Sequence, residues 1–241
     1  MKAVLVSDTI ILLLALIMAV ASSLMLPVAC GRFLRLGGIE SEPSAVPVLV
    51  AQQYKVAIVD HAEKIPSGEV PSEFVEIASQ RYQVTLPWAG HRLTARVSEV
   101  QPLLVSLPRS VIDGDGSIYV TKATHRAFLE MSVMAVADGV PLLVDSGYRS
   151  VAYQKKIFEQ RMVAAGDFQS ISRWVAPPGY SEHMLGTAID LSPSNWTFGG
   201  TKVEQWMEKN AFRFGFNQSY PRHSPHGFTW EPWHWRFVGD S

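Results

Sequence analysis

The sequence predicts an α+β domain in the second half of the 241-residue chain, with helices packed on a small antiparallel sheet. Two observations support this fold class. Three segments carry apolar residues at the three-and-four spacing of an amphipathic helix, and short apolar runs of strand length lie between and after them. Glycines and capping residues stand at the expected ends of these segments.

The first predicted helix covers residues 123–138. Phe128, Met131 and Met134 fall on one of its faces, and Gly139 is well placed to end it. A short apolar strand is predicted directly afterwards, over residues 140–145.

The second predicted helix covers residues 151–165, with Ser150 as its cap and Gly166 at its end. Gln154 lies one turn before the apolar Phe158, so it should point inward. A third helix opens at the capping-box pattern that runs from Thr201 to Glu204. Further strands are predicted at 54–59, 83–86, 93–97, 188–191 and 233–238.

The N-terminus carries 20 uncharged, mostly apolar residues from Ile10 to Ala29, enough to span a bilayer as a helix. Three interpretations remain open: a retained membrane anchor, a secretory signal cleaved near Ala21, and a lipoprotein signal ending at Cys30. The resulting organisation is an anchor or signal at 1–30, a linker at 31–47, an N-terminal subdomain or elaboration at 48–108, and the main domain at 109–241. The chain is then delivered to, or across, a membrane.

The bulk composition excludes several classes of protein. Lys and Arg total 21 against 22 Asp and Glu, which is not the basic excess of a nucleic-acid-binding protein. The single cysteine, Cys30, permits neither an intramolecular disulfide nor a thiolate zinc cage. Any metal must therefore be held by histidine and carboxylate side chains.

Two segments combine such side chains, 181–190 and 231–235. Two histidines and one carboxylate, here His183, Asp190 and His234, form a ligand set of catalytic zinc sites and leave a position for water. Asp190 lies in an apolar run, where a carboxylate is costly unless it is paired or bound to metal. Gly186 would let the chain turn between His183 and Asp190. Glu231 is the candidate general base, brought to the same cavity by a bend at Pro232.

Each of these residues also has a simpler interpretation when taken alone. His183 could be a loop histidine, Asp190 a helix cap or salt-bridge partner, and His234 a core histidine between two tryptophans. The spacing of the residues does not by itself decide between a shared metal site and these separate structural roles.

The order of the motifs adds a resemblance. Ser181-x-His183-x-x-Gly186-x-Ala188-x-Asp190 is followed by Glu231-x-Trp233-His234, and a Tyr148-Arg149-Ser150 element precedes both. This set resembles the VanY-type D-alanyl-D-alanine carboxypeptidases, a family grouped with VanX-like D,D-dipeptidases and L-alanyl-D-glutamate endopeptidases of bacterial cell-wall metabolism. The resemblance covers residues 129–239, about half of the chain.

The resemblance implies a fold of the LAS/hedgehog-like peptidase type, with zinc at the sheet. It implies His183, Asp190 and His234 as zinc ligands and Glu231 as the catalytic base. Arg149 would polarise the scissile carbonyl or hold a substrate carboxylate. The remaining implied residues contact substrate and are Ser181, Gln154, Tyr148 and Trp233.

The expected function is therefore a zinc-dependent D,D-carboxypeptidase that removes the terminal D-Ala of peptidoglycan stem peptides. It would act on the extracytoplasmic side of the bacterial cytoplasmic membrane, in the periplasm or cell wall. Three alternatives stay open: an endopeptidase on the same polymer, a non-catalytic zinc-containing wall-binding module, and a binding protein whose function lies in residues 48–108. A dedicated D,D-dipeptidase fits less well, because its substrate is cytoplasmic and this chain carries an export signal.

Overall fold

The computed structural model describes residues 72–239. The chain divides into two compact units, Met1–Ile58 and Val59–Ser241, and every described residue belongs to the second. The predicted anchor or signal, the linker and the strand at 54–59 lie outside the described residues. Within residues 72–239, no helix is long and apolar enough to cross a membrane.

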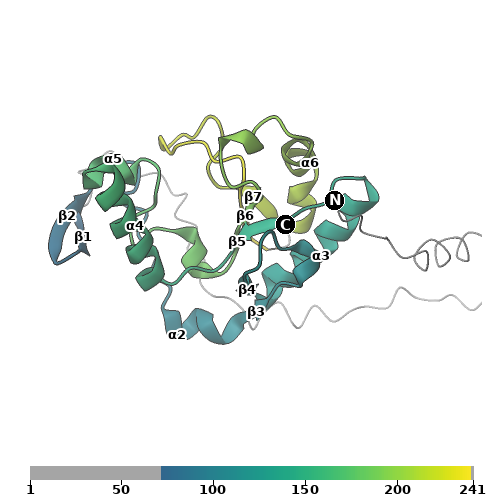
Figure 1. Ribbon diagram of the computed structural model, residues 1–241, viewed down its shortest axis with the longest axis horizontal. Helices are drawn as coiled ribbons and strands as arrows, with labels where there is room; N and C mark the ends of the chain where they lie inside the picture. Colours follow the sequence, from purple (N-terminus) through teal and green to yellow (C-terminus); the bar gives the residue numbers. More distant parts are fainter. Residues whose placement is uncertain (1–71, 240–241) are drawn as a thin grey trace, which may run out of the picture. The chain divides into compact units, whose positions relative to one another are not determined.

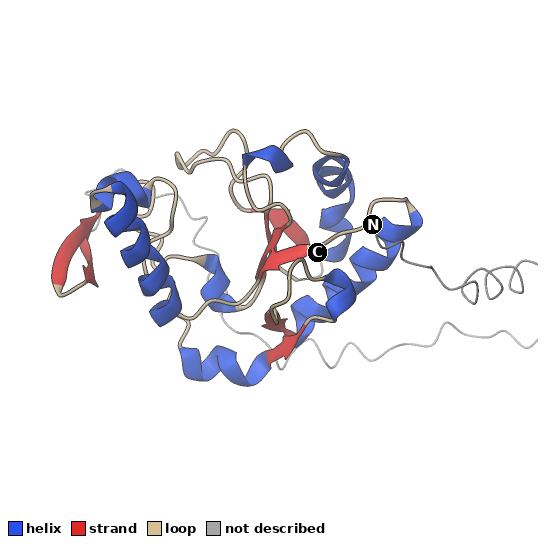
Figure 2. Ribbon diagram, viewed as in Figure 1, coloured by secondary structure: helices blue, strands red, loops and turns tan. Residues whose placement is uncertain are grey.

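Helices and short strands alternate along the second unit, with the strands of the largest sheet near its centre (Figure 2). The α-helices are α2 (Val97–Val100), α3 (Lys122–Ala137), α4 (Val151–Ala165), α5 (Phe168–Ser172) and α6 (Lys202–Asn210). The strands are β1 (Glu73–Ile77), β2 (Gln80–Val84), β3 (Leu104–Ser106), β4 (Tyr119–Thr121), β5 (Val144–Ser146), β6 (Ala188–Leu191), β7 (Phe216–Gln218) and β8 (His234–Phe237). The 3₁₀ turns are η2 (Gln101–Leu103), η3 (Arg109–Val111), η4 (Glu182–Leu185), η5 (Trp196–Phe198) and η6 (Ala211–Phe214).

The central sheet has four strands in the order β5-β6-β8-β7, and every pair is antiparallel. Two further antiparallel pairs, β1-β2 and β3-β4, complete the strands of the described region. Helices combined with small antiparallel sheets confirm the predicted α+β class.

The helix starts follow from local side-chain chemistry. The Ser150 hydroxyl accepts a hydrogen bond from the Tyr153 backbone N–H and caps α4. The Thr201 hydroxyl accepts from the Glu204 N–H in the same way and caps α6. The Glu204 carboxylate, however, accepts from the backbone N–H of Gly200, one residue before the cap. The predicted cap is confirmed, while the reciprocal half of the capping box is displaced by one residue.

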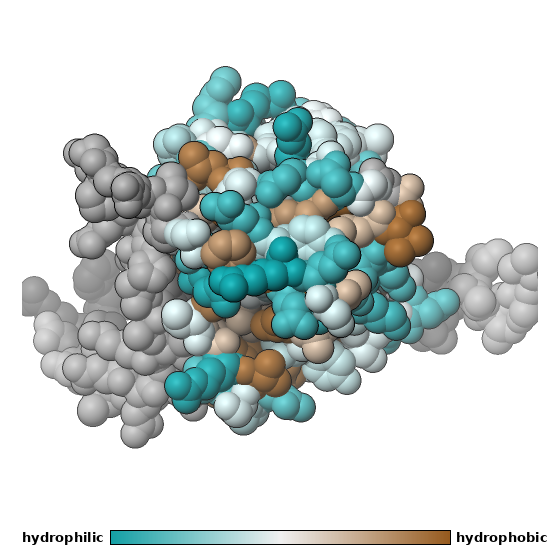
Figure 3. Space-filling model, turned by 90° about the vertical axis from the view of Figure 1, so that its left-hand side faces the viewer, coloured by the Kyte–Doolittle hydropathy of each residue, from teal (hydrophilic) through white to brown (hydrophobic). Residues whose placement is uncertain are grey.

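Two hydrophobic clusters hold these elements together. One joins α3 and α6 to the central sheet, and the other joins the β1-β2 hairpin to α4 and α5. Figure 1 shows the corresponding arrangement, with α3 and α6 on one side of the sheet and α4, α5 and the hairpin on the other. The second cluster includes Ile77 of the hairpin and Phe158 of α4, both almost fully buried. On the face seen in Figure 3, hydrophobic residues form small patches among hydrophilic ones.

Several predicted boundaries need correction. Strand β2 is Gln80–Val84 rather than 83–86, because it pairs with β1 and ends before Pro87, which has no N–H to donate. The expected strand at 93–97 is absent from the described region. No strand among the described residues pairs with this segment, and α2 begins at its end. Only the end of the predicted strand at 140–145 pairs, as β5, because Pro141 interrupts its start.

Candidate metal centre and active site

The central sheet places two of the three predicted ligands directly opposite each other. Asp190 on β6 and His234 on β8 are register partners in an antiparallel pair. Side chains at directly opposed positions lie on the same face of a sheet, about 4.5–5.5 Å apart at Cβ. Ser146 on β5 pairs with Asp190 on its other side. One row across the sheet therefore carries Ser146, Asp190 and His234.

The third ligand, His183, comes from the short turn η4. Gly186 ends this turn with a φ of 68°, in the left-handed region that glycine adopts without strain. A Cβ at Gly186 would also lie 2.9 Å from the side chain of Leu104. The chain can then reverse into β6, so that His183 and Asp190 face the same point. This turn confirms the role predicted for Gly186.

The three side chains form a compact and buried cluster. His183, Asp190 and His234 each offer a ligand atom, and these atoms lie within 4.8 Å of one another. All three residues are at least 95% buried. His183 Nε2 is 3.1 Å from Asp190 Oδ2, and His234 Nδ1 is 3.0 Å from Asp190 Oδ1. Two imidazole nitrogens and one carboxylate at this separation fit a divalent metal such as zinc.

The hydrogen bonds of His183 select the nitrogen that can bind a metal. Its Nδ1 lies 2.6 Å from the carbonyl oxygen of Gly147, which can only accept, so Nδ1 must carry the proton. Burial and the neighbouring positive charge of Arg149 lower the pKa of His183 to about 4. The ring is therefore neutral at neutral pH, and its Nε2 lone pair points into the cluster. Gly147 is itself required, because a Cβ there would lie 2.6 Å from the Tyr119 carbonyl oxygen.

His234 is oriented by an acidic residue that the sequence did not single out. Its Nε2 donates to Glu182 Oε2 at 3.0 Å, and this leaves Nδ1 for the metal. Glu182 is held in turn by Arg236, whose guanidinium donates to Glu182 Oε1 at 2.6 Å. Although burial opposes ionisation of Glu182, His234 and Arg236 lower its pKa to about 2. Burial likewise disfavours a charged His234, but Asp190 and Glu182 raise its pKa to about 10, so metal binding displaces a proton from Nδ1.

We expect Glu182→Gln to weaken zinc binding by roughly 10–100-fold, the range typical for outer partners of metal ligands. A carboxylate can only accept, so it forces the proton of His234 onto Nε2; an amide can also donate and permits the other tautomer. The measurement is competition for zinc with a chromophoric chelator. Glu208→Gln removes an exposed acid on α6 and is the matched control. Equal zinc affinity in the Glu182 variant and the parent would contradict the orienting role.

Glu231 reaches the same cluster across the bend that was predicted at Pro232. Its backbone carbonyl accepts from the His234 N–H at 3.1 Å, which closes a turn immediately before β8. Its carboxylate oxygen lies 4.0 Å from His234 Nδ1. Burial raises the pKa of Glu231 to about 7, and nearby charges make smaller contributions in both directions. A carboxyl group with this pKa can both take and return a proton near neutral pH.

Arg149 forms the adjoining wall through contacts from all three of its nitrogens. It donates to Asp190 Oδ2 at 2.6 Å, to the Ser146 hydroxyl at 3.0 Å and to Gln154 Oε1 at 3.4 Å. Gln154 is 2% exposed and donates in turn to the Ala176 carbonyl oxygen at 2.9 Å, which confirms its predicted inward orientation. These bonds use three of the five N–H donors of the guanidinium and leave the others for a ligand.

The three candidate ligands line one cavity of about 230 Å³ together with Glu231, Arg149 and Gln154. Ser181 and Trp233 line it as well, so all the predicted site residues except Tyr148 meet there. Tyr148 is half-buried and donates its backbone N–H to the Tyr119 carbonyl oxygen. The cavity also has walls that the sequence did not indicate, from Trp88, Trp174, Tyr220, Arg161 and Ser194. No local pattern marks these residues, since they come from separate segments that meet only in the fold.

A comparison with known families identifies this arrangement. A family model described as VanY, D-alanyl-D-alanine carboxypeptidase, matches residues 117–240, just over half of the chain. The matched segment contains every predicted site residue. This chain belongs to the VanY family. The resemblance seen in the motifs is confirmed.

Known VanY relatives agree with this assignment. A D-alanyl-D-alanine carboxypeptidase of Enterococcus faecalis is 37% identical over 115 residues, which cover 44% of this chain and 43% of the relative. Another, from Enterococcus faecium, is 29% identical over 197 residues, or 78% of this chain and 62% of the relative. The chain thus matches less than two thirds of the length of either relative.

A solved structure supports the fold. The LD-carboxypeptidase LdcB is 34% identical and superimposes with a TM-score of 0.53, covering 57% of this chain and 69% of that chain. The VanY domain therefore has the predicted peptidase fold, with the candidate metal centre on its sheet.

Proposed function

We propose that this protein is a zinc-dependent D,D-carboxypeptidase that removes the terminal D-Ala from peptidoglycan stem peptides. One observation carries the proposal: three ligand atoms within 4.8 Å of one another share a cavity with an acid suited to proton transfer, Glu231. Membership of the VanY family and the names of the relatives support the choice of substrate.

In this proposal His183, Asp190 and His234 hold zinc through Nε2, a carboxylate oxygen and Nδ1. When bound, zinc would lower the pKa of a water molecule and polarise the scissile carbonyl. Glu231 takes a proton from the attacking water, whose oxygen bonds to the carbonyl carbon. The same carboxyl group then delivers that proton to the leaving amine as the C–N bond breaks. Burial raises the pKa of Glu231 to about 7, and this value suits the carboxyl group to both tasks.

The other residues of the cavity position the substrate. Arg149 is fixed by Ser146, Gln154 and Asp190, and it lines the cavity, so its remaining N–H donors are available to hold the scissile carbonyl. Ser181 and Trp233 provide a polar and an apolar part of the wall. The cavity of about 230 Å³ suits a small terminal residue such as D-alanine.

The direct test is to incubate the full chain with a stem pentapeptide ending in D-Ala-D-Ala, with and without a zinc chelator, and to weigh the products. We expect loss of one terminal alanine, abolished by the chelator and restored by added zinc. Absence of any cleavage while zinc is bound stoichiometrically would overturn the proposal in favour of a non-catalytic binding module.

A second candidate is L,D-carboxypeptidase activity, favoured by the similarity to LdcB. A stem tetrapeptide, which ends in a single D-Ala, separates the two activities in the same assay. Shortening of the tetrapeptide alone would favour the L,D reaction, and cleavage between internal residues would indicate an endopeptidase.

We further propose that the protein acts outside the cytoplasmic membrane, where stem peptides are exposed. The apolar segment Ile10–Ala29 supports this location as an anchor or signal. Extracellular protease added to intact spheroplasts should degrade the protein, or the protein should appear in the released fraction. Complete protection in intact spheroplasts would contradict this location.

A further inference from the structure

One face of α4 lines a second cavity beside the metal centre. Tyr153, Ile157, Gln160, Arg161 and Ala164 border a space of about 510 Å³. Their spacings of four, seven, eight and eleven residues from Tyr153 fall on one side of an α-helix. The adjacent side of α4 is buried through Gln154 and Phe158. The helix therefore has one face for the core and one for this cavity.

The two cavities are continuous. They share five wall residues, namely Arg149, Ile157, Arg161, Asp190 and Ser194. A peptide whose scissile bond lies at the metal centre would therefore extend along α4 into the larger space.

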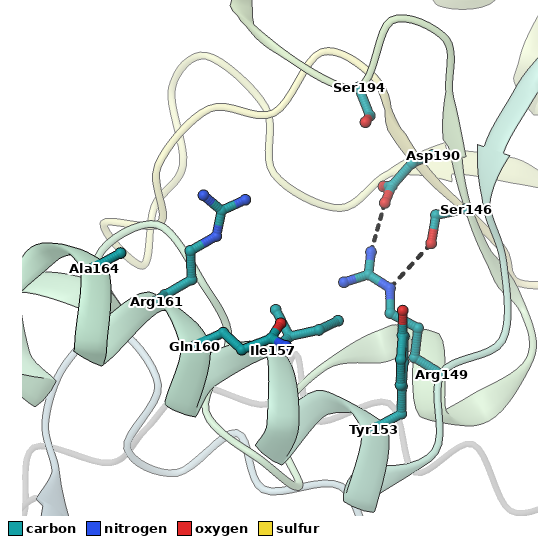
Figure 4. Close-up of a pocket in the computed structure, with 9 residues that line it drawn as sticks. All are labelled: Ser146, Arg149, Tyr153, Ile157, Gln160, Arg161, Ala164, Asp190 and Ser194. Carbon is teal, nitrogen blue, oxygen red and sulfur yellow. Dashed lines mark hydrogen bonds and ion pairs between the residues drawn. The ribbon is translucent and has the colours of Figure 1, made fainter. Parts of the chain in front are cut away.

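The charges in the larger cavity are unbalanced. Arg149 is paired with Asp190 at 2.6 Å, and Asp190 is the only acid that lines this space in the described part of the chain. Arg161 makes no ion pair or hydrogen bond with any residue in 72–239. Its guanidinium extends from α4 into the cavity, opposite Ser194 and Asp190 (Figure 4). Arg161 is exposed to solvent, so this hollow in the surface presents an accessible cation that forms no ion pair within residues 72–239.

We propose that Arg161 binds a carboxylate of the substrate. This inference rests on the proposed function and deepens it by assigning a second recognition element. Arginine suits the role, because its planar fork can bind both oxygens of a carboxylate. Arg149 is less free for the same task, since Asp190, Ser146 and Gln154 already hold it.

A stem peptide offers two sources of such a carboxylate. One is the C-terminal carboxylate of the leaving residue, the group that distinguishes a chain end from an internal bond. The other is a carboxylate on a residue upstream of the scissile bond. Both present the same chemistry to Arg161, and a matched set of peptides distinguishes them.

The test measures peptide binding separately from turnover. Dissociation constants are measured by calorimetry on full-length zinc-loaded protein carrying Glu231→Gln, so that hydrolysis does not interfere. Three peptides are compared: the free acid, its C-terminal amide, and a free-acid peptide whose upstream carboxylates are amidated. Each is tested with Arg161 intact, with Arg161→Gln and with Arg161→Lys. Lys156→Gln is the control, because it removes one positive charge from an exposed position on the same helix.

We expect Arg161→Gln to weaken binding of the free acid by about 10-fold, as for loss of a partly solvated charge-assisted hydrogen bond. The same change should leave binding unaltered for whichever amidated peptide lacks the recognised carboxylate. Arg161→Lys should retain part of the effect, and Lys156→Gln should behave like the parent.

The inference would be overturned if Arg161→Gln left the binding of all three peptides unchanged, or if none of the three peptides bound to the protein with Arg161 intact. The proposed function has its own criterion, which is chelator-sensitive hydrolysis by the protein with Glu231 intact. A protein that hydrolyses the pentapeptide but binds it independently of Arg161 would leave the function standing and remove only this recognition element.

Discussion

Replacing His183 with alanine should abolish both zinc binding and hydrolysis. The change removes one of three ligands, and a buried cluster that has lost an imidazole cannot complete the set around the ion. We expect zinc affinity to fall by more than about 100-fold, beyond the range typical for outer partners of ligands. The measurement is zinc content after gel filtration, together with the rate of D-Ala release.

His223→Ala is the matched control for this variant. His223 lies on an exposed loop and is not part of the described ligand cluster. It should leave zinc content and turnover at the parental level. Stoichiometric zinc bound at parental affinity in the His183 variant would show that the ligand set is wrong.

Replacing Glu231 with glutamine should separate metal binding from catalysis. Glutamine has nearly the same shape but cannot take a proton from water, so we expect kcat to fall by about 10²–10⁴-fold. Zinc content should stay stoichiometric, because Glu231 is not needed to complete the three-ligand set. Steady-state kinetics and zinc analysis on the same preparation provide the two readouts.

Glu208→Gln, an exposed acid-to-amide change on α6, is the control for Glu231 as well. Full activity of the Glu231 variant would refute the assignment of the catalytic base. Loss of zinc together with activity would instead show that Glu231 contributes to metal binding, and the contrast with the His183 variant would disappear.

The agreement between the predicted and observed elements has a local cause. Helix α4 covers the predicted residues, since the Ser150 hydroxyl caps its first turn and Gly166 ends it, and both signals act within a few residues. The turn at Gly186 and the strand that carries Asp190 are local in the same sense. The boundaries of β2 were wrong because its extent follows from its register with β1 across a short turn, and not from the residue pattern of the segment itself.

The same distinction applies to the site. The sequence identified His183, Asp190 and His234, because residue type, burial of an acid in an apolar run and motif order are all visible in the chain. It did not identify Glu182 as the partner of His234 and Arg236, since these contacts join positions more than 50 residues apart. Arg161 was missed for a related reason, because only the packing of α4 against the rest of the domain places this exposed side chain beside Asp190 and Arg149.

From the sequence alone came the α+β class, the family resemblance, the ligand set and the candidate base, all of which depend on residue type, spacing and short-range preference. Only the tertiary structure determines the tautomers of His183 and His234, the burial that raises the pKa of Glu231, and the cavity along α4. These properties arise from contacts between residues that are distant in the chain, and spacing along a sequence does not record such contacts.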